Sequence, residues 1–372
     1  MENDADGVLL DLGDGTTVRC SRLPDRLGRG AVSAELLRHN KGNAATLGIW
    51  RVRGPLGSAV LKISSPPVDG HVGFWPTSDD PSHWNYWRRE ALAYTSGLTA
   101  TAYAGTGITT ADLLESTVRP DGLVEFWLAD VSGTDGFSWS VPRIARFAYE
   151  LGTGQARWVG RVPGTDWLSR QWLAQYLVEG PSLSVRIQDN FWDHPRVTGW
   201  RASVRERLGW LWPNRERILA VARAAPRTLC HLDVWPANLL DSEGKSVLLD
   251  WSFVGEGAVG EDVSNLIVDS FADGLMDPRL VAEVAETAVD GYLIGLRDGG
   301  WSGSPDQVRT TIAACGAAKY SWLPPAILGR VVSDDLGTSS YNRDTSIDEV
   351  VQRVAGLFEL LAEWTTVADA AG

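Results

Sequence analysis

Three polar side chains in one stretch of the sequence have the types and spacing that phosphoryl transfer requires. Asp233 and Asn238 are five residues apart, and Asp250 follows twelve residues later at the end of an apolar run. A carboxylate can orient an attacking hydroxyl and accept its proton, and Mg²⁺ prefers carboxylate, amide and phosphate oxygens as ligands. We therefore interpret Asp233 as a catalytic carboxylate, and Asn238 and Asp250 as catalytic residues that hold the metal.

Each of these residues also has a structural interpretation. Asp233 could cap a turn, Asn238 could hold one, and Asp250 could end a strand. His231, two residues before Asp233, is more often a hydrogen-bonded core residue than a proton shuttle, and we assign it a structural role in orienting the loop. A structural explanation is sufficient for each residue alone, but the combined spacing favours catalysis.

A competing signal lies in residues 255–260, GEGAVG, which fit the GxGxxG pattern of dinucleotide-binding loops. Such a site requires a βαβ unit with an acid at the tip of the following strand, about 20 residues further on. The chain after Asp262 has the pattern of a helix, so this acid is missing. We interpret the glycines as a plain turn after the apolar run that ends at the metal-binding Asp250, and we expect Asp262 to brace this turn.

The elements that must position these residues differ between the two parts of the chain. The first part alternates short extended runs with turns, as antiparallel strands do, and Asp121-Gly122 is a hairpin signal. The predicted elements of this part are strands over 31–38, 46–53, 58–63, 112–119 and 123–131, turns at 40–43 and 54–57, a loop over 64–83 and a helix over 84–96.

The second part has mostly helical periodicity. Residues 141–225 are expected to be helical with breaks near 180 and 194, and residues 262–367 with breaks near 299–305 and 324–325; two short apolar runs, 228–232 and 246–250, lie between them. The predicted fold class is α+β, with two lobes. A small antiparallel, nucleotide-binding β lobe spans 1–132, and a larger, mainly helical lobe with the catalytic loop and acceptor site spans 133–372.

The motif HLDVWPAN at 231–238, followed by LLDW at 248–251, resembles the catalytic loop and metal-binding Asp of the aminoglycoside phosphotransferase/choline kinase group. This resemblance implies a bilobal protein-kinase-like fold and a Mg²⁺-dependent transfer of a phosphate from ATP, or alternatively GTP, to an alcohol. The resemblance is specific around 230–262 and architectural over 141–225 and 280–372.

The resemblance also implies a nucleotide site in the first part of the chain. Lys62, on the strand predicted at 58–63, would contact the α- and β-phosphates, and Glu90 on the next helix would hold it in place. The structural alternative is an edge-strand lysine and a solvated helix charge. Further nucleotide contacts implied by the resemblance are the turn over the phosphates, with Asn40, Lys41 and Gly42, and the backbone of the hinge at 127–131, with Leu128 and Asp130.

The composition limits the partners. The 372 residues carry a net charge of −13 without a basic cluster, which argues against nucleic acid and is compatible with a cationic or neutral ligand. The stretch 246–278 contains seven acids and no Lys or Arg, and these acids would suit an amine-bearing acceptor such as an aminoglycoside-like antibiotic, an amino sugar or an amino alcohol. A solvated helix face explains them equally well. These acids are Asp250, Glu256, Glu261, Asp262, Asp269, Asp273 and Asp277.

Three functions therefore stay open: a small-molecule kinase, which could confer antibiotic resistance, a kinase for Ser/Thr of a peptide in natural-product biosynthesis, and a non-catalytic kinase-like binding module. The 18 tryptophans could form a peptide groove, although core packing explains them better. The three cysteines lack metal-ligand spacing, and neither a signal peptide nor a transmembrane run is visible, so a cytoplasmic protein that does not bind membranes is expected.

Overall fold

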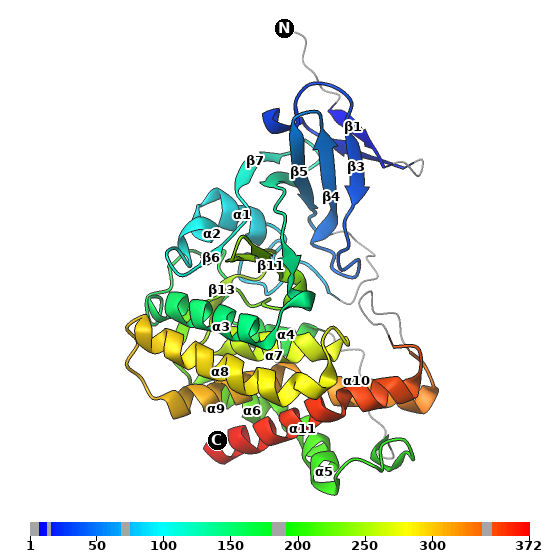
Figure 1. Ribbon diagram of the computed structural model, residues 1–372, viewed down its shortest axis with the longest axis vertical. Coiled ribbons are helices and arrows are strands. Elements are labelled where there is room, and N and C mark those ends of the chain that lie inside the picture. Colours follow the sequence, from blue (N-terminus) through cyan, green and yellow to red (C-terminus); the bar gives the residue numbers. More distant parts are fainter. Residues whose placement is uncertain (1–6, 13–15, 68–74, 181–190, 337–343) are drawn as a thin grey trace.

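The computed structural model describes residues 7–12, 16–67, 75–180, 191–336 and 344–372. A small lobe dominated by an antiparallel sheet lies at one end of the molecule, and a larger lobe of packed helices lies at the other (Figure 1). The predicted α+β class with these two lobes is confirmed. The exact division at residue 132 stays a prediction.

The small lobe contains an antiparallel sheet whose two faces have different roles. On β5, Ala59, Leu61 and Ile63 point into a buried cluster that also contains residues of the β1–β2 hairpin, while Lys62 lies on the opposite face, across from Phe126 of β8. The alternation of side chains along a strand thus separates the core of this lobe from the face that carries Lys62. In spatial order the sheet strands are β3 (Ser33–Leu36), β4 (Thr46–Gly54), β5 (Gly57–Ser64), β8 (Val124–Ala129) and β7 (Leu113–Val118), and the hairpin is β1 (Val8–Asp11) with β2 (Thr17–Cys20).

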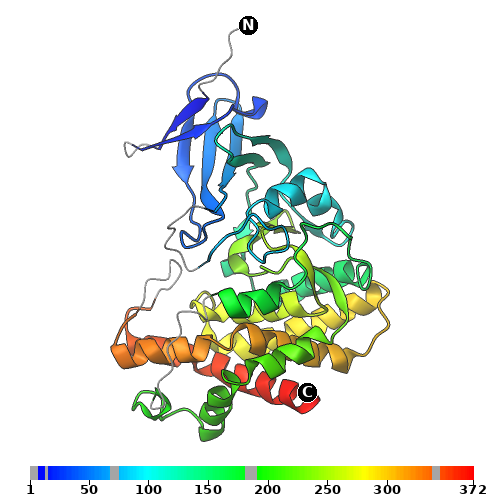
Figure 2. The ribbon, with the colours of Figure 1, turned by 180° about the vertical axis from the view of Figure 1, so that it is seen from behind.

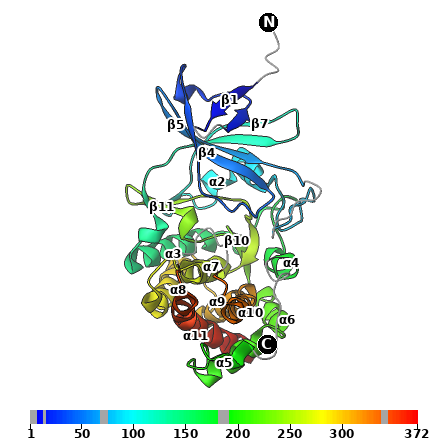
Figure 3. The same ribbon diagram turned by 90° about the vertical axis from the view of Figure 1, so that its right-hand side faces the viewer.

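Short strands between the lobes hold the stretch that carries the predicted catalytic residues (Figure 3). Antiparallel strands β11 and β12 flank a tight turn, and β10 pairs with β13. Strands β6 and β9, from the chain before the helical lobe proper, join β12 and β11 at the edges of the same sheet. The strands are β6 (Ile108–Thr109), β9 (Thr134–Asp135), β10 (Arg227–Cys230), β11 (Leu239–Ser242), β12 (Lys245–Leu248) and β13 (Gly255–Ala258).

Helices of the large lobe stack in layers below these strands (Figures 1 and 2). Glycines allow α3 and α8 to approach closely: a Cβ on Gly295 would lie 2.1 Å from the carbonyl oxygen of Tyr149, and a Cβ on Gly152 would lie 2.3 Å from that of Tyr292. Helices α1 (Arg89–Thr95) and α2 (Leu98–Thr101) come earlier in the chain. The helices that follow are α3 (Val141–Ala156), α4 (Trp172–Glu179), α5 (Ala202–Leu211), α6 (Arg215–Arg223), α7 (Glu261–Ala272), α8 (Val281–Asp298), α9 (Pro305–Lys319), α10 (Leu323–Ser333) and α11 (Ile347–Ala371).

Three details of the sequence-based prediction are wrong. Residues 255–258 form strand β13 rather than a plain turn; a Cβ on Gly255 would lie 2.1 Å from the carbonyl oxygen of Ser169, so the glycine permits close packing. The helix predicted over 84–96 begins only at Arg89, because Asn85 is held by hydrogen bonds to Asn43 and the carbonyl of Pro76.

The third difference has its origin in proline and glycine. The chain is not helical between α3 and α4, where Gly160, Pro163 and Gly164 follow closely. The break predicted near 324–325 is present, because α9 ends at Lys319 and α10 begins at Leu323, and Pro324 and Pro325 lie in the first turn of α10, which tolerates missing N–H groups. Of the loop predicted at 64–83, residues 68–74 lie outside the described residues. In the described part of the chain, no helix is both long enough and apolar enough to cross a membrane.

Candidate active site

The loop after β10 and the loop after β12 bring the predicted catalytic residues together. Asn238 ends a short 3-10 turn directly before β11, and the backbone N–H of Leu249 donates to its carbonyl oxygen at 2.9 Å. This bond places Asp250 beside Asn238. Asp250 has a left-handed backbone (φ 60°), so the chain turns sharply after β12.

Asn238 is bound to Asp233 through both donors of its amide. Its Nδ2 donates to the carbonyl oxygen and to Oδ2 of Asp233, both at 2.9 Å. The amide orientation is fixed by these two acceptors. The amide oxygen of Asn238 therefore stays available to accept a hydrogen bond or to bind a metal ion. The same bonds hold the Asp233 carboxylate in one position.

Lys62 connects the small lobe to the loop after β12. Its ammonium forms ion pairs with Glu90 of α1 and with Asp250, the latter at 3.1 Å. The hydroxyl of Ser252 lies within hydrogen-bonding distance of both of these carboxylates. Lys62 and Glu90 are almost fully buried, while about a third of the Asp250 side chain is exposed, at 33%.

The charges of this group influence one another strongly. Burial alone would lower the pKa of Lys62, but Asp250 and Glu90 outweigh it and raise this pKa. Burial would raise the pKa of Asp250, but the charge of Lys62 and the bond from Ser252 lower it below its ordinary value. Burial raises the pKa of Glu90 to about 7 despite its pairing with Lys62. Lys62 and Asp250 are thus fixed in their charged forms near neutral pH.

Asp233 has the opposite electrostatic character. Burial, followed by the negative charge of Asp250, raises the pKa of Asp233 to about 8. A carboxylate with a pKa near the working pH is well matched to accepting a proton. The pair Asp233 and Asp250 therefore have environments that separate their pKa values in opposite directions.

The catalytic loop is braced from α7. Asp262 accepts hydrogen bonds from the backbone N–H groups of His231 and Leu232, at 2.8 and 2.7 Å, and from the side chain of Gln155 at 2.7 Å. Leu232 has a left-handed backbone (φ 68°), which is strained for a leucine. The Asp262 brace stabilises this conformation, so Asp262 braces the catalytic loop rather than a glycine turn.

His231 lies in the core beneath the loop. Its side chain is fully buried, its ring packs edge-on against Trp251 with centroids 5.0 Å apart, and Nδ1 accepts from the backbone N–H of Asp233 at 3.3 Å. Burial lowers the pKa of His231 to about 4, so the ring is neutral at pH 7. These contacts are those of a residue that positions the loop.

The remaining residues predicted to bind the nucleotide lie in a turn and at the end of β8. Asn40, Lys41 and Gly42 form an exposed turn between β3 and β4, in which the side chain of Asn40 accepts from the N–H of Gly42 at 2.9 Å. Leu128 pairs with Val60 and lies on the same sheet face as Lys62. The side chain of Asp130 is engaged by Arg51 at 3.0 Å, so only its backbone groups suit the hinge role.

The acids between 246 and 278 are mostly compensated. Glu256 pairs with Arg170, Asp269 with Lys319 and Asp277 with Arg279, while Glu261 and Asp262 are buried at the start of α7. The stretch therefore presents less uncompensated negative charge than its sequence suggests.

Sequence reasoning missed several residues around this site. Ser252 was within the motif but had no assigned role, and Arg89, next to Glu90, is buried and donates to five backbone carbonyls. Lys319 and Tyr320 contact Asp269 from a helix about 50 residues away. Only Ser252 had a signal, its place two residues after Asp250.

Comparisons with known proteins agree with this geometry. Residues 134–302 match the model of the phosphotransferase enzyme family. No curated protein sequence matches the chain. The match confirms the resemblance to the aminoglycoside phosphotransferase/choline kinase group and the predicted enzyme class, a phosphotransferase with an alcohol group as acceptor.

Two solved structures share the fold at low identity. Amicoumacin kinase hAmiN, in complex with AMP-PNP, Ca²⁺ and Ami, superposes with a TM-score of 0.50 at 13% identity and covers 91% of this chain and 88% of that chain. An aminoglycoside phosphotransferase from Alicyclobacillus acidocaldarius subsp. acidocaldarius DSM 446 has a TM-score of 0.50 at 17% identity, over 90% of this chain and 92% of that chain. The two-lobed architecture is thus that of the protein-kinase-like fold.

Proposed function

We propose that this phosphotransferase moves the γ-phosphate of ATP, or alternatively GTP, to a hydroxyl group of a small molecule. The observation that supports this proposal most directly is the Lys62–Asp250 ion pair. It joins the sheet of the small lobe to the loop after β12, next to the bonded pair of Asp233 and Asn238. Candidate acceptors are aminoglycoside-like antibiotics, amino sugars and amino alcohols.

In the proposed reaction, Asp233 orients the acceptor hydroxyl and takes its proton. The bond between the acceptor oxygen and the γ-phosphorus forms, and the bond from the γ-phosphorus to the β–γ bridging oxygen breaks, so that ADP leaves. Lys62 binds the α- and β-phosphates while Glu90 holds it in place, and its ion pair with Asp250 supports this role because it places the ammonium beside the proposed metal-binding carboxylate. Catalysis is then mainly positioning and charge stabilisation.

The residues present fit a Mg²⁺ ion bound together with the nucleotide. Asn238 offers an amide oxygen because its Nδ2 is engaged by Asp233, and Asp250 stays ionised. Within the described residues, no group of three or more His, Cys, Asp or Glu side chains could hold a metal ion. This suits Mg²⁺, which is commonly held by one or two carboxylates plus substrate phosphates. When bound, the ion would neutralise charge that develops on the phosphates.

Thermal unfolding tests the nucleotide site. The wild type, Asp250→Asn and the surface control Asp290→Asn are unfolded with Mg·ATP, with Mg·GTP and without nucleotide. A ligand that binds only the folded state at 100 times its Kd adds about 2.7 kcal/mol of stability. We expect a rise in Tm for the wild type and Asp290→Asn that Asp250→Asn loses. A wild type that neither nucleotide stabilises would contradict the proposal.

Acceptor identity is tested by ADP release with alcohols of different classes. Small-molecule hydroxyls should stimulate ADP release, and Asp233→Asn should abolish the stimulation. If only Ser/Thr peptides stimulate it, the protein is a peptide kinase. Nucleotide binding without any transfer would indicate a non-catalytic module.

A further inference from the structure

A second charged group lies beside the catalytic loop, on the side of α7. Asn265 of α7 donates from Nδ2 to the carbonyl oxygen of Leu232 at 3.3 Å, and Asp269 lies one turn further along the same face of the helix. Asp269 keeps 24% of its side-chain surface exposed and accepts a hydrogen bond from Tyr320 at 2.5 Å. The group therefore begins next to the loop that carries Asp233.

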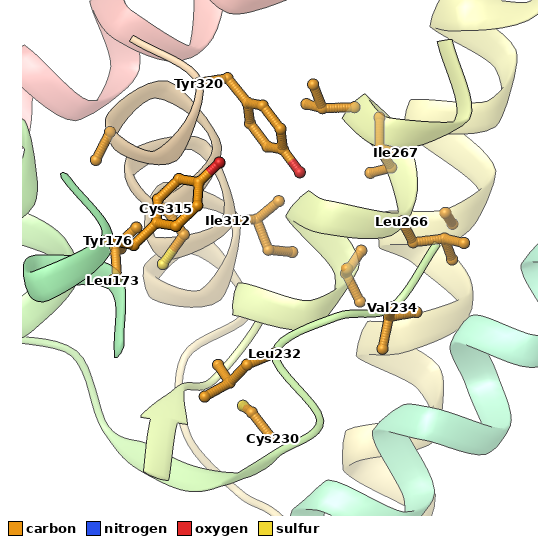
Figure 4. Close-up of a cluster of buried hydrophobic side chains, with 14 of the residues drawn as sticks. Leu173, Tyr176, Cys230, Leu232, Val234, Leu266, Ile267, Ile312, Cys315 and Tyr320 are labelled. Atoms are coloured by element: carbon orange, nitrogen blue, oxygen red, sulfur yellow. The ribbon is translucent and has the colours of Figure 1, made fainter. Parts of the chain in front are cut away.

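Lys319 places its ammonium in the centre of this group. Its Nζ is 3.4 Å from Asp269 and lies 5.1, 5.9 and 4.9 Å from the ring centroids of Trp172, Tyr176 and Tyr320. Only 6% of the Lys319 side chain is exposed. Trp172 and Tyr176 are stacked with centroids 4.7 Å apart, and both rings come from α4. Figure 4 shows Tyr176 and Tyr320 in the same cluster of buried side chains as Leu232 and Val234. We call Asp269 and these three rings the cation cage.

The cation cage adjoins the loop that carries the catalytic aspartate, because Asn265, one turn before Asp269 on α7, is bonded to the carbonyl oxygen of Leu232, next to Asp233. The positive charge of Lys319 lowers the pKa of Asp233, and the negative charge of Asp269 raises it. Tyr176 and Tyr320, whose pKa values are raised mainly by burial, are also influenced by both Asp233 and Asp269. An acceptor whose hydroxyl reaches Asp233 is therefore within range of the charges of Lys319 and Asp269.

Aromatic rings together with a carboxylate are the surroundings in which proteins bind the ammonium group of a ligand. Here the cage already contains an ammonium group of the chain itself. A second cation placed there would meet the Lys319 charge at close range in a buried setting, where like charges repel strongly. The cage thus excludes the type of group that its rings would otherwise attract.

We propose that Lys319 occupies the cation position of the acceptor site, so that the enzyme selects alcohols that are neutral or anionic next to the reacting hydroxyl. This inference rests on the proposed function, since it assigns the acceptor class of the same site. Among the candidate acceptors above, it disfavours small amino alcohols, whereas amines at the far end of a larger acceptor are compatible with it. Lys319 is then a residue that determines specificity.

The first test refills the cage from solution. Lys319→Ala removes the atoms of an n-propylammonium ion, so n-propylammonium chloride should raise the Tm of this variant in a concentration-dependent way, while 1-propanol should not. The wild type, Lys319→Met, in which an apolar chain fills the space, and the exposed control Lys245→Ala should show no such rise. A Lys319→Ala protein that responds equally to both compounds, or to neither, would overturn the proposal, whether or not an acceptor is turned over.

The second test compares two alcohols of the same shape, choline and its uncharged isostere 3,3-dimethyl-1-butanol, by ADP release. We expect the wild type to prefer the neutral alcohol at least tenfold in kcat/KM, and Lys319→Ala to lose or invert this preference. Equal use of choline by the wild type would overturn the assignment. Mg·ATP is added to the same thermal samples, so a missing nucleotide shift identifies a failure of the proposed function separately from a failure of the cage.

Discussion

At the scale of single residues, the site depends on placing two carboxylates with opposite tasks a short distance apart. Asp250 stays ionised because Lys62 lies 3.1 Å away, whereas burial raises the pKa of Asp233 to about 8. In the proposed mechanism, the same residue type thus serves one position that needs permanent charge and another that exchanges a proton. The environment of each Asp, rather than its identity, decides its role.

Asp233→Asn keeps the shape of the side chain but removes its ability to take a proton. We expect kcat for phosphate transfer to fall by about 10²- to 10⁴-fold, the usual contribution of a general base. Nucleotide binding should be nearly unchanged, because the proposed nucleotide contacts lie on other residues. ADP release and the Tm shift with Mg·ATP measure the two quantities, and the exposed control Asp290→Asn should alter neither. A variant that keeps more than a tenth of its activity would contradict a proton-accepting role.

Lys62→Met should destabilise the fold in a pH-dependent manner. Breaking a buried ion pair by removing one partner costs about 3–5 kcal/mol, because the other charge is left without compensation. Glu90 can avoid this cost by binding a proton, and its pKa, already about 7, will rise further without Lys62. When the pKa of a carboxyl is higher in the folded than in the unfolded state, the folded protein loses stability as the pH increases from the unfolded-state pKa towards the folded-state pKa.

Urea unfolding at pH 6 and pH 8 should therefore show a larger loss for Lys62→Met at pH 8. The double variant Lys62→Met/Glu90→Gln no longer has the Glu90 carboxyl and keeps only that of Asp250 beside the lost ammonium, so its loss should depend less on pH than that of the single variant. Equal losses for the single variant at both pH values would show that Glu90 does not titrate in this range.

At the scale of elements, Arg89 at the start of α1 connects three segments. Its guanidinium donates to the carbonyl oxygens of residues 81, 83 and 84 in the preceding loop, of Trp167 before α4 and of Ser252 in the loop after β12. Arg89→Met should leave these carbonyls unpaired and cost at least about 2 kcal/mol, since each unsatisfied buried group costs roughly 1–3 kcal/mol.

Hydrogen exchange locates the expected effect of Arg89→Met. Exchange should accelerate in residues 81–88 and near Trp167, while the β4–β5 hairpin stays protected. Arg88→Met is a matched control, because the neighbouring Arg88 is exposed and only stacks on Trp87. Equal exchange in both variants would exclude a connecting role for Arg89.

The sequence allowed the prediction of elements whose signals are local. Alternating side chains indicated β4 and β5, and the spacing of Asp233, Asn238 and Asp250 indicated one site because a short chain segment connects them. Residues 255–258 were misinterpreted because a strand rich in glycine looks like a turn until its partner β10 and the approach of Ser169 are known. The place of Lys319 beside the site could not be predicted from the sequence, since its contact with Asp269 arises from the packing of α9 against α7.

At the scale of the whole molecule, the two lobes have cores of unequal size. The core between the sheet and the β1–β2 hairpin contains eleven buried residues, among them Cys20, whereas Cys230 and Cys315 lie in a much larger cluster that extends from the other face of the sheet through the helical lobe. Local opening is easiest where few apolar contacts must be broken. We expect the small lobe to open before the helical lobe does.

The three cysteines report this order directly. Burial raises the pKa of Cys20 to about 12 and the pKa values of Cys230 and Cys315 well above their ordinary value, so none should react with a thiol reagent at pH 8 in the native protein. On stepwise addition of urea, one thiol should react first and two should follow together. Cys20→Ala should remove the early phase alone. Mg·ATP should delay that phase, because a nucleotide between the lobes stabilises only molecules in which the small lobe is folded. Simultaneous reaction of all three thiols would instead mean that contacts between the lobes, such as the ion pair of Lys62 with Asp250 in the loop after β12, join them into one cooperative unit.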